Sequence, residues 1–350
     1  MIKVTFLGTS AAAPTVSRNV SSIAVKREGE LMLFDCGEGT QRQMMRFGTG
    51  FDVRDVFFTH LHADHFLGLI GFVRTLWMAD RQEPMRIYGP KPAQRVLSQA
   101  LGLGLQGQRF PVEIYELGDG DVVKRDGYEV RAFKVDHRIS ALGYALVEPA
   151  RPGLFDPQAA RALGVPDGPL FRRLQLGTPV TIPAMPVEEL IELTRVNRRL
   201  DAYDEHVARQ GGRVVEPSQV MGGARPGRKV VLSGDTRPCA ATVQAAAKAD
   251  LLIHEATFGD EEIDRALETA HSTAREAGRV AREADVRRLV LTHVSSRYDL
   301  DVSPLVKQAR EEFPRVEYAK DGWTIEIGYP DEDAAKAAEP AKPEPPPQPT

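Results

Sequence analysis

The stretch FFTHLHADHFLGL, residues 57–69, constrains this chain more than any other part of its sequence. It places His60, His62, Asp64 and His65 within six positions, between two apolar runs. Ionisable side chains beside buried sequence need partners, because an unpaired buried charge is costly. Imidazole nitrogens and carboxylate oxygens are ligands that Zn²⁺ and similar divalent cations accept. The stretch therefore predicts a metal site where a strand meets a helix, rather than a solvated loop that happens to be rich in histidine.

The remaining histidines extend this pattern. The chain has eight histidines, and apart from His206 each lies at or near the C-terminal end of a strand-like run or just before a helix start. Ligand clefts in open α/β sheets gather at the C-terminal ends of strands. The further candidates are His137, His254, His271, His293 and Asp235. Taken singly, His137 or His254 fits a hydrogen-bonded core histidine and Asp235 fits a helix N-cap. Taken jointly, they predict one shared site.

Strand-like and helix-like runs together predict an α/β fold. Strand-like runs follow one another in the first half, and in the second half runs such as 228–236 and 249–257 alternate with helical segments. Two sheets, each covered by helices, satisfy this pattern.

One region interrupts this order. Residues 150–186 contain seven prolines, and 187–210 have the apolar spacing of an additional helix. We expect an insertion at 150–212 within a single domain spanning 1–330. The tail at 331–350 is rich in proline and charge and has no aromatic residue, which predicts disorder.

Composition limits the classes of function. No apolar run is long enough to span a membrane, and the N-terminus lacks the pattern of a signal peptide. The two cysteines, Cys36 and Cys239, fit free thiols in a reducing cytoplasm. The formal net charge is −4, of which −3 lies in 331–350, so the totals show no broad basic surface for nucleic acid.

The motif THLHADH matches the His-x-His-x-Asp-His signature of the metallo-β-lactamase superfamily. Further segments resemble the ribonuclease Z family, endonucleases that trim tRNA precursors at their 3′ end. These segments include LFDCGEGTQRQ, GVPDGPLFRRLQLG, PGRKVVLSGDTRP, LIHEATF, HSTAREA and LTHVSSRY. The signature alone indicates only the superfamily, whereas its combination with HEATF, HST and the Gly-Pro segment is specific. The resemblance implies an αββα sandwich of the metallo-β-lactamase type with an inserted protruding arm.

The resemblance also implies two Zn²⁺ ions per subunit. One ion would be held by His60, His62 and His137, the other by Asp64, His65 and His293, with Asp235 bridging both. Neither cysteine lies where it would complete a closed structural zinc site.

The same resemblance implies catalytic roles. Asp64 would also act as general base, and His271 would donate a proton to the leaving oxygen. Glu255 would orient His271, and Arg297 would hold a substrate phosphate. The alternative roles are an N-cap for His271 and a solvated surface position for Arg297.

Substrate choice would come from the arm, because a metal site binds a phosphate and reads no base sequence. By resemblance the arm grips tRNA, with Arg172 and Arg173 contacting backbone phosphates. The helix at 187–210 departs from the shorter bacterial members of the family. Between Val187 and Arg213 there are six acidic and five basic residues, which favours packing on the arm or on a dimer partner over RNA contact.

The expected protein is a cytoplasmic, homodimeric, zinc-dependent endoribonuclease without membrane contact. It would leave a tRNA 3′-hydroxyl and a trailer with a 5′-phosphate. One alternative is a small-molecule phosphodiesterase or thioesterase of the same superfamily. The other is an RNA-binding module with structural metals, which would need neither open coordination positions nor Asp64 and His271.

Overall fold

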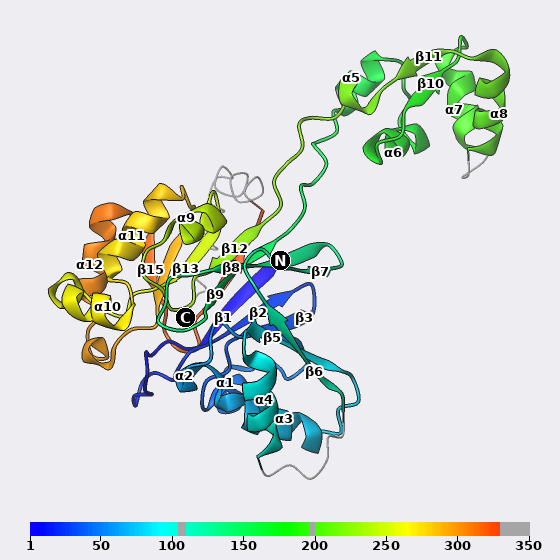
Figure 1. Cartoon of the computed structure of the whole chain (residues 1–350). Coiled ribbons are helices and arrows are strands. Elements are labelled where there is room, and N and C mark those ends of the chain that lie inside the picture. The colour runs from blue at the N-terminus through cyan, green and yellow to red at the C-terminus, as the bar shows by residue number, and fades with distance from the viewer. Residues whose placement is uncertain (104–109, 196–199, 330–350) are drawn as a thin grey trace, which may run out of the picture. The chain divides into compact units, whose positions relative to one another are not determined.

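A computed structural model of the chain describes residues 1–103, 110–195 and 200–329 (Figure 1). Its contacts separate two compact units. The first joins Met1–Glu148 to the described residues from Arg228 onward, and the second is Pro149–Gly227. The tail predicted at 331–350 lies outside the described residues. No helix in the described ranges is long and apolar enough to cross a membrane.

One sheet of the first unit has seven described strands in the order β16-β1-β2-β3-β4-β5-β6. Strands β16, β1, β2 and β3 pair antiparallel, whereas β3, β4, β5 and β6 pair parallel. The bounds are β1 Ile2–Gly8, β2 Ser22–Arg27, β3 Glu30–Phe34, β4 Val53–Phe57, β5 Met85–Pro90, β6 Val112–Leu117 and β16 Thr324–Ile327.

The second sheet also has seven described strands, in the order β15-β14-β13-β12-β9-β8-β7. Strands β12 to β15 are parallel, and β9, β8 and β7 continue the sheet antiparallel. The bounds are β7 Val122–Arg125, β8 Tyr128–Lys134, β9 Leu142–Val147, β12 Lys229–Leu232, β13 Leu251–Glu255, β14 Leu289–Thr292 and β15 Val316–Tyr318.

Helices cover the outer face of each sheet (Figure 1). The helices on the first sheet are α1 Thr40–Phe47, α2 Ala63–Phe66, α3 Gly68–Met78 and α4 Ala93–Gly102, and those of the second half are α9 Ala240–Ala246, α10 Ile263–Thr269, α11 Ala274–Glu283 and α12 Ser303–Glu312. Adjacent strand residues point to opposite faces. Val230 therefore joins the core between the sheets, whereas Val231 packs among residues of α9, α11 and α12. The layers form the predicted αββα sandwich.

The strand-like runs predicted at 228–236 and 249–257 contain β12 and β13 in the structure. The short strands β7 and β15 and the helix α10 were not predicted. Each has seven residues or fewer, so its own sequence carries little periodic signal.

The second unit contains α5 Pro157–Ala162, α6 Pro169–Gln175, β10 Val180–Ile182, α7 Val187–Arg195, α8 Asp201–Gln210 and β11 Arg213–Val215. It has its own apolar core, which includes Leu170, Leu190, Tyr203 and Val215. The insertion was expected to end at 212, but β11 pairs with β10 and the unit extends to Gly227.

The prediction of one helix over 187–210 is wrong. Helix α7 ends at Arg195 and α8 begins at Asp201. Leu200, directly before α8, has a left-handed backbone with φ 59°. That conformation cannot continue a right-handed helix. The apolar spacing nevertheless had a cause, because Leu190 and Tyr203 are both buried in the same core.

Candidate metal centre

Strand ends bring the predicted ligands together in the first unit. His60, Asp235 and His293 follow the ends of β4, β12 and β14, and His137 follows β8. Nitrogen atoms of His60, His62 and His137 lie within 4.8 Å of one another. The same holds for the ligand atoms of Asp64, His65 and His293. These are the two ligand sets that the family resemblance implied.

The Oδ2 atom of Asp235 lies between the two sets. It is 3.6 Å from His60 Nε2, 3.3 Å from His65 Nε2 and 3.4 Å from His293 Nε2. Asp64 Oδ2 lies 3.5 Å from His65 Nε2 and 3.6 Å from His293 Nε2. A tetrahedral ion with bonds of about 2.0–2.2 Å separates its ligand atoms by about 3.3–3.6 Å. The spacing fits donor atoms arranged around a cation.

Two buried nitrogen atoms support the same fit. His65 Nε2 and His293 Nε2 are buried and have no hydrogen-bond partner. Buried polar atoms are nearly always paired, because an unsatisfied one costs about 1–3 kcal/mol. Both atoms face the carboxylates of Asp64 and Asp235. A divalent cation between these atoms would satisfy all of them.

The opposite ring nitrogen of most of these histidines is held by a neighbour. His65 Nδ1 lies 2.7 Å from Asp35 Oδ2, and His293 Nδ1 lies 3.0 Å from Thr257 Oγ1. His60 Nδ1 lies 3.1 Å from Thr59 Oγ1, and His137 Nδ1 lies 3.0 Å from the carbonyl oxygen of Ala270. Such bonds fix the tautomer that leaves Nε2 free for a metal.

His62 is oriented differently. Its Nδ1 atom, rather than Nε2, lies 2.9 Å from His60 Nε2 and 3.3 Å from His137 Nε2. Because Nδ1 is the His62 atom that lies beside the Nε2 atoms of the other two ligands, His62 would bind a metal through Nδ1.

The supporting residues Asp35, Thr59 and Thr257 were not predicted from the sequence. Asp35 comes directly after β3, so it shares the strand-end position of the predicted ligands. That position was the one available signal. Thr59 contacts Asp35, 24 positions away, as well as its neighbour His60, and Thr257 contacts His293, 36 positions away. No local pattern reveals the longer contacts.

Gly234 permits the close approach of two of these segments. Its φ is +63°, and a Cβ atom there would lie 2.9 Å from the Cβ of Thr59. A side chain at this position would be strained and would displace either Asp235 or His60, the residues that follow Gly234 and Thr59.

Buried carboxylates set the charge of the cluster. Burial acts to raise the pKa of Asp235, but His293, His65 and His60 outweigh it and hold that pKa well below its ordinary value. At His65, burial is outweighed by Asp235 and Asp35, which hold the imidazole pKa well above its ordinary value. Burial lowers the pKa of His60. The ionised carboxylates are therefore stabilised by positive charge beside them, and bound cations would supply that charge.

Asp64 lies at the edge of the cluster, with its side chain 12% exposed. Its Oδ2 atom accepts a hydrogen bond of 2.9 Å from the amide of Ala12. Burial acts to raise its pKa, but the neighbouring His293 and His65 outweigh burial and lower the pKa. The carboxylate is therefore ionised.

His271 lies beside the cluster and is bound to Glu255. Its Nδ1 atom is 2.8 Å from Glu255 Oε1. Glu255 is fixed in turn by the amide of Thr236 at 2.8 Å and the hydroxyl of Thr257 at 2.7 Å. Burial acts to lower the pKa of His271, but Glu255 outweighs it and raises that pKa to about 9. Helix α11 is capped by Thr273, so His271 is not its N-cap.

Other candidates lie outside the cluster. His254 is fully buried, with Nδ1 at 2.7 Å from the carbonyl oxygen of Glu255, as expected of a core histidine. The guanidinium of Arg297 pairs with Glu262 at 3.2 Å. In the second unit, Arg173 forms a bidentate ion pair with Asp204 of α8, whereas the adjacent Arg172 is exposed.

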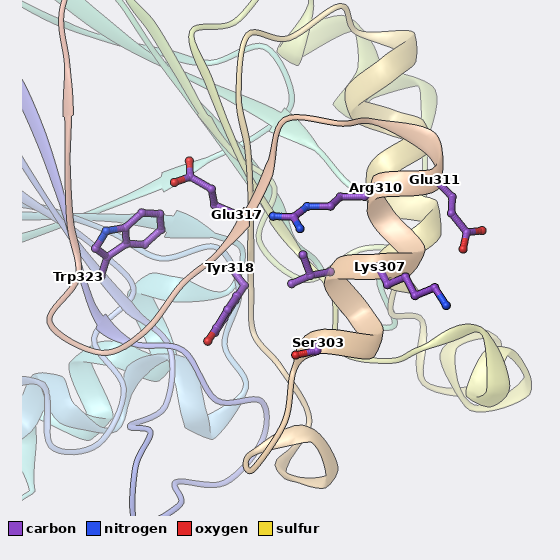
Figure 2. A pocket seen from close by; sticks show the side chains of 8 residues that line it. Ser303, Lys307, Arg310, Glu311, Glu317, Tyr318 and Trp323 are labelled. Carbon is purple, nitrogen blue, oxygen red and sulfur yellow. The ribbon is translucent and has the colours of Figure 1, made fainter.

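A groove of about 670 Å³ lies away from these residues, between α12, β15 and Trp323. Figure 2 shows Arg310 extending from α12 toward β15. The two cations that line the groove, Lys307 and Arg310, are balanced by Glu311 and Glu317. It contains no predicted site residue and no excess charge that would select a ligand.

Comparisons with known proteins agree with this fold. A family model described as "Beta-lactamase superfamily domain" matches residues 172–294, and one described as "Anti-Pycsar protein Apyc1" matches 2–147. The crystal structure of human tRNase Z, short form, has a TM-score of 0.62 at 27% identity, covering 93% of this chain and 99% of that chain. The metallo-beta-lactamase fold protein YhfI from Bacillus subtilis has a TM-score of 0.61 at 18% identity, covering 93% and 100%.

Relatives of similar length decide the family. A ribonuclease Z from Myxococcus xanthus is 58% identical over 93% of this chain and 98% of its own length. A ribonuclease Z from Haloferax volcanii is 49% identical over 96% and 98%. This chain belongs to the ribonuclease Z family. The predicted family, the metallo-β-lactamase fold and the prediction of an enzyme of this hydrolase class are thereby confirmed.

Proposed function

We propose that this ribonuclease Z family member is a zinc-dependent endoribonuclease that removes the 3′ trailer from tRNA precursors. The observation that carries the proposal is the pair of three-ligand sets joined by Asp235 Oδ2. The named relatives and the similarity to human tRNase Z support tRNA as the substrate class. The unpaired buried nitrogens of His65 and His293 support a bound cation.

Two divalent ions would be held by the proposed sets. His60, His62 and His137 would bind one, Asp64, His65 and His293 would bind the other, and Asp235 would bind both. When bound, the ions polarise the scissile phosphate and lower the pKa of a bound water. Zinc is proposed because imidazole-rich sets with few carboxylates suit it.

The residues beside the ions would move protons. Asp64 would accept the proton of the attacking water as the water oxygen bonds to phosphorus. His271, oriented by Glu255, would donate a proton to the departing 3′-oxygen as the P–O3′ bond breaks. The phosphate then remains on the trailer as a 5′-phosphate, and the tRNA keeps a 3′-hydroxyl. Arg297 would contact a substrate phosphate once it exchanges Glu262 for that anion.

The second unit would act as the arm that binds tRNA. Arg172 is exposed and forms no ion pair with the residues that the structure describes, so it would contact a backbone phosphate. Arg173 is committed to Asp204, so we assign it to holding α6 on α8 rather than to RNA, which revises the expectation drawn from the sequence.

We further propose a homodimer in the cytoplasm. The homodimer rests on family resemblance alone, and light scattering at micromolar concentration would test it, a monomer mass being the contrary result. The cytoplasmic location rests on the two free cysteines, Cys36 and Cys239.

The variant Asp64→Ala tests the function. Cleavage of a 3′-extended tRNA precursor should fall by about 10²–10⁴-fold, because the ligand and the proposed base are lost together. Binding of the precursor should stay within about threefold, because the arm is intact. Asp126→Ala, in the exposed turn between β7 and β8, is the matched control. If Asp64→Ala binds no precursor, or if it still cleaves the precursor, the assignment is refuted.

A further inference from the structure

We propose that Arg237 is a positioning residue that fixes His271 against the candidate metal centre. The inference rests on the proposed function, in which His271 supplies a proton to the leaving group. Arg237 contacts no proposed metal ligand with its side chain; its contacts go to the backbone of His271 and to the start of α11.

The guanidinium of Arg237 joins two parts of the His271 segment. Its Nη1 donates to the carbonyl oxygen of His271 at 2.6 Å and to Glu276 Oε2 at 2.7 Å, and Nη2 makes a second bond to Glu276. The side chain is 16% exposed and that of Glu276 is 11% exposed. A bidentate pair with a carboxylate fixes the plane of a guanidinium, so the third bond reaches His271 in a defined direction.

The backbone of Arg237 is itself anchored to the metal centre. Its amide donates to the carbonyl oxygen of Asp136 at 2.7 Å, next to the proposed ligand His137. Two residues before it is Asp235, the proposed bridging ligand. Arg237 therefore links His271 to two of the loops that carry proposed metal ligands, the loop of His137 and the loop of Asp235.

His271 needs such a restraint because its own segment is short of regular structure. It lies between the end of α10 and the N-cap of α11, and the preceding Ala270 has φ 58°. Its amide donates to the carbonyl oxygen of Ala266 at 2.9 Å, and among the described residues the hydrogen-bond partners of its ring, Glu255 and Thr257, both lie at Nδ1. Without Arg237 the ring would keep its hydrogen bond to Glu255, but its distance from the leaving oxygen would no longer be fixed.

Three variants separate positioning from stability. Arg237→Met removes every side-chain donor but keeps a side chain of similar length. Arg237→Lys keeps the charge and one donor nitrogen. Glu276→Gln weakens the ion pair but leaves the Arg237 contact to His271. Glu276 also accepts from the amide of Thr273 in the capping box, which the glutamine oxygen can still do.

Two substrates and one spectrum give the readout. Precursor tRNA has a poor leaving group that needs a proton, whereas bis(p-nitrophenyl) phosphate expels p-nitrophenolate, which does not. In the metal-loaded protein, ¹⁵N-labelled imidazole resonances report ring positions, with the signal of His271 assigned from its loss in His271→Ala.

Arg237→Met should lower kcat on precursor tRNA by about 10–100-fold, with KM within about twofold, because misplacement by about 1 Å has such an effect. Hydrolysis of bis(p-nitrophenyl) phosphate should stay within about threefold. The His271 resonance should shift while those of the ligand histidines stay. Arg237→Lys should recover part of kcat, and Glu276→Gln should lose thermal stability and lower kcat less than Arg237→Met does, because Arg237 keeps its bond to His271.

Equal losses on both substrates would overturn the proposal, and so would a loss of kcat in Glu276→Gln as large as that in Arg237→Met. An unchanged His271 resonance in Arg237→Met would also overturn it. If the wild-type protein fails to cut precursor tRNA, the proposed function fails, and the His271 resonance still decides the role of Arg237.

Discussion

At the scale of single residues, the candidate metal centre depends on side chains that bind no metal themselves. Asp35 is the clearest case, because it is buried and its carboxylate lies 2.7 Å from His65 Nδ1. The amide and hydroxyl of Thr59 also donate to it, at 2.8 Å and 3.0 Å. Asp35 thereby fixes the ring whose other nitrogen faces Asp64 and Asp235.

The variant Asp35→Asn should bind metal about 10–100-fold more weakly, the usual effect of removing such a supporting group. Competition with a chromophoric chelator measures this affinity. Asp55→Asn is the matched control, since Asp55 is a buried carboxylate on the neighbouring strand β4 that pairs with Arg125 and Arg86. Equal losses of affinity in both variants would contradict the role of Asp35.

The proposed metal ligands could be recognised in the sequence, whereas the residues that hold them in place could not, and the reason is physical. His60, His62 and His65 are recognisable because one local turn requires their spacing. Asp35, Thr257 and Arg237 contact residues that lie 30 to 36 positions away in the chain. Nothing within a short window of sequence records those contacts, so only the folded structure brings them into view.

At the scale of secondary-structure elements, long periodic segments were predictable and short ones were not. Helix α11 has a capping box and an apolar face, both of which can be recognised in its sequence. Helices α5 and α6 have six and seven residues, fewer than two turns, and they were missed. Their apolar residues are explained by the core of the second unit, where Ala160 and Leu170 are buried.

Helix α6 carries two adjacent arginines with different surroundings. Arg172 is exposed, whereas Arg173 pairs with Asp204 and lies over the ring of Tyr203 at 5.5 Å. Arg172→Ala should weaken precursor tRNA binding and lower the slope of log K against log salt by about 0.9, because one phosphate contact is lost.

Arg173→Ala serves as the comparison and should leave that slope unchanged while lowering the thermal stability of the second unit. Both are measured as precursor affinity at several salt concentrations, in an Asp64→Ala background that does not cut. Equal slope changes in the two variants would show that the ion pair with Asp204 does not keep Arg173 from the RNA.

At the scale of the whole molecule, the chain leaves and re-enters the first unit at neighbouring positions. The amide of Glu148 donates to the carbonyl oxygen of Arg228 at 3.0 Å. The carboxylate of Glu148 binds Arg228 Nε and Arg27 Nε, each at 2.7 Å, and all three residues are buried. Contacts within the first unit therefore hold its chain ends at Glu148 and Arg228 together without residues 149–227.

Replacing 149–227 by a short Gly-Ser linker should leave a folded first unit, because its three apolar clusters lie outside the replaced segment. Thermal unfolding should remain cooperative and bis(p-nitrophenyl) phosphate should still be hydrolysed, whereas cleavage of precursor tRNA should fall sharply. If small-diester hydrolysis and tRNA cleavage are lost together in a folded protein, the inserted unit supports the site rather than the substrate.

The central claim is that this chain cuts precursor tRNA with metal held by His60, His62, Asp64, His65, His137, Asp235 and His293. The most direct measurement combines elemental analysis of the purified protein with cleavage of a 3′-extended precursor, before and after chelation, and mapping of both product ends. We predict two equivalents of zinc per chain, cleavage abolished by the chelator and restored by zinc, a tRNA 3′-hydroxyl and a 5′-phosphorylated trailer. Cleavage that survives removal of the metal, or a tRNA ending in a 2′,3′-cyclic phosphate, would contradict the account.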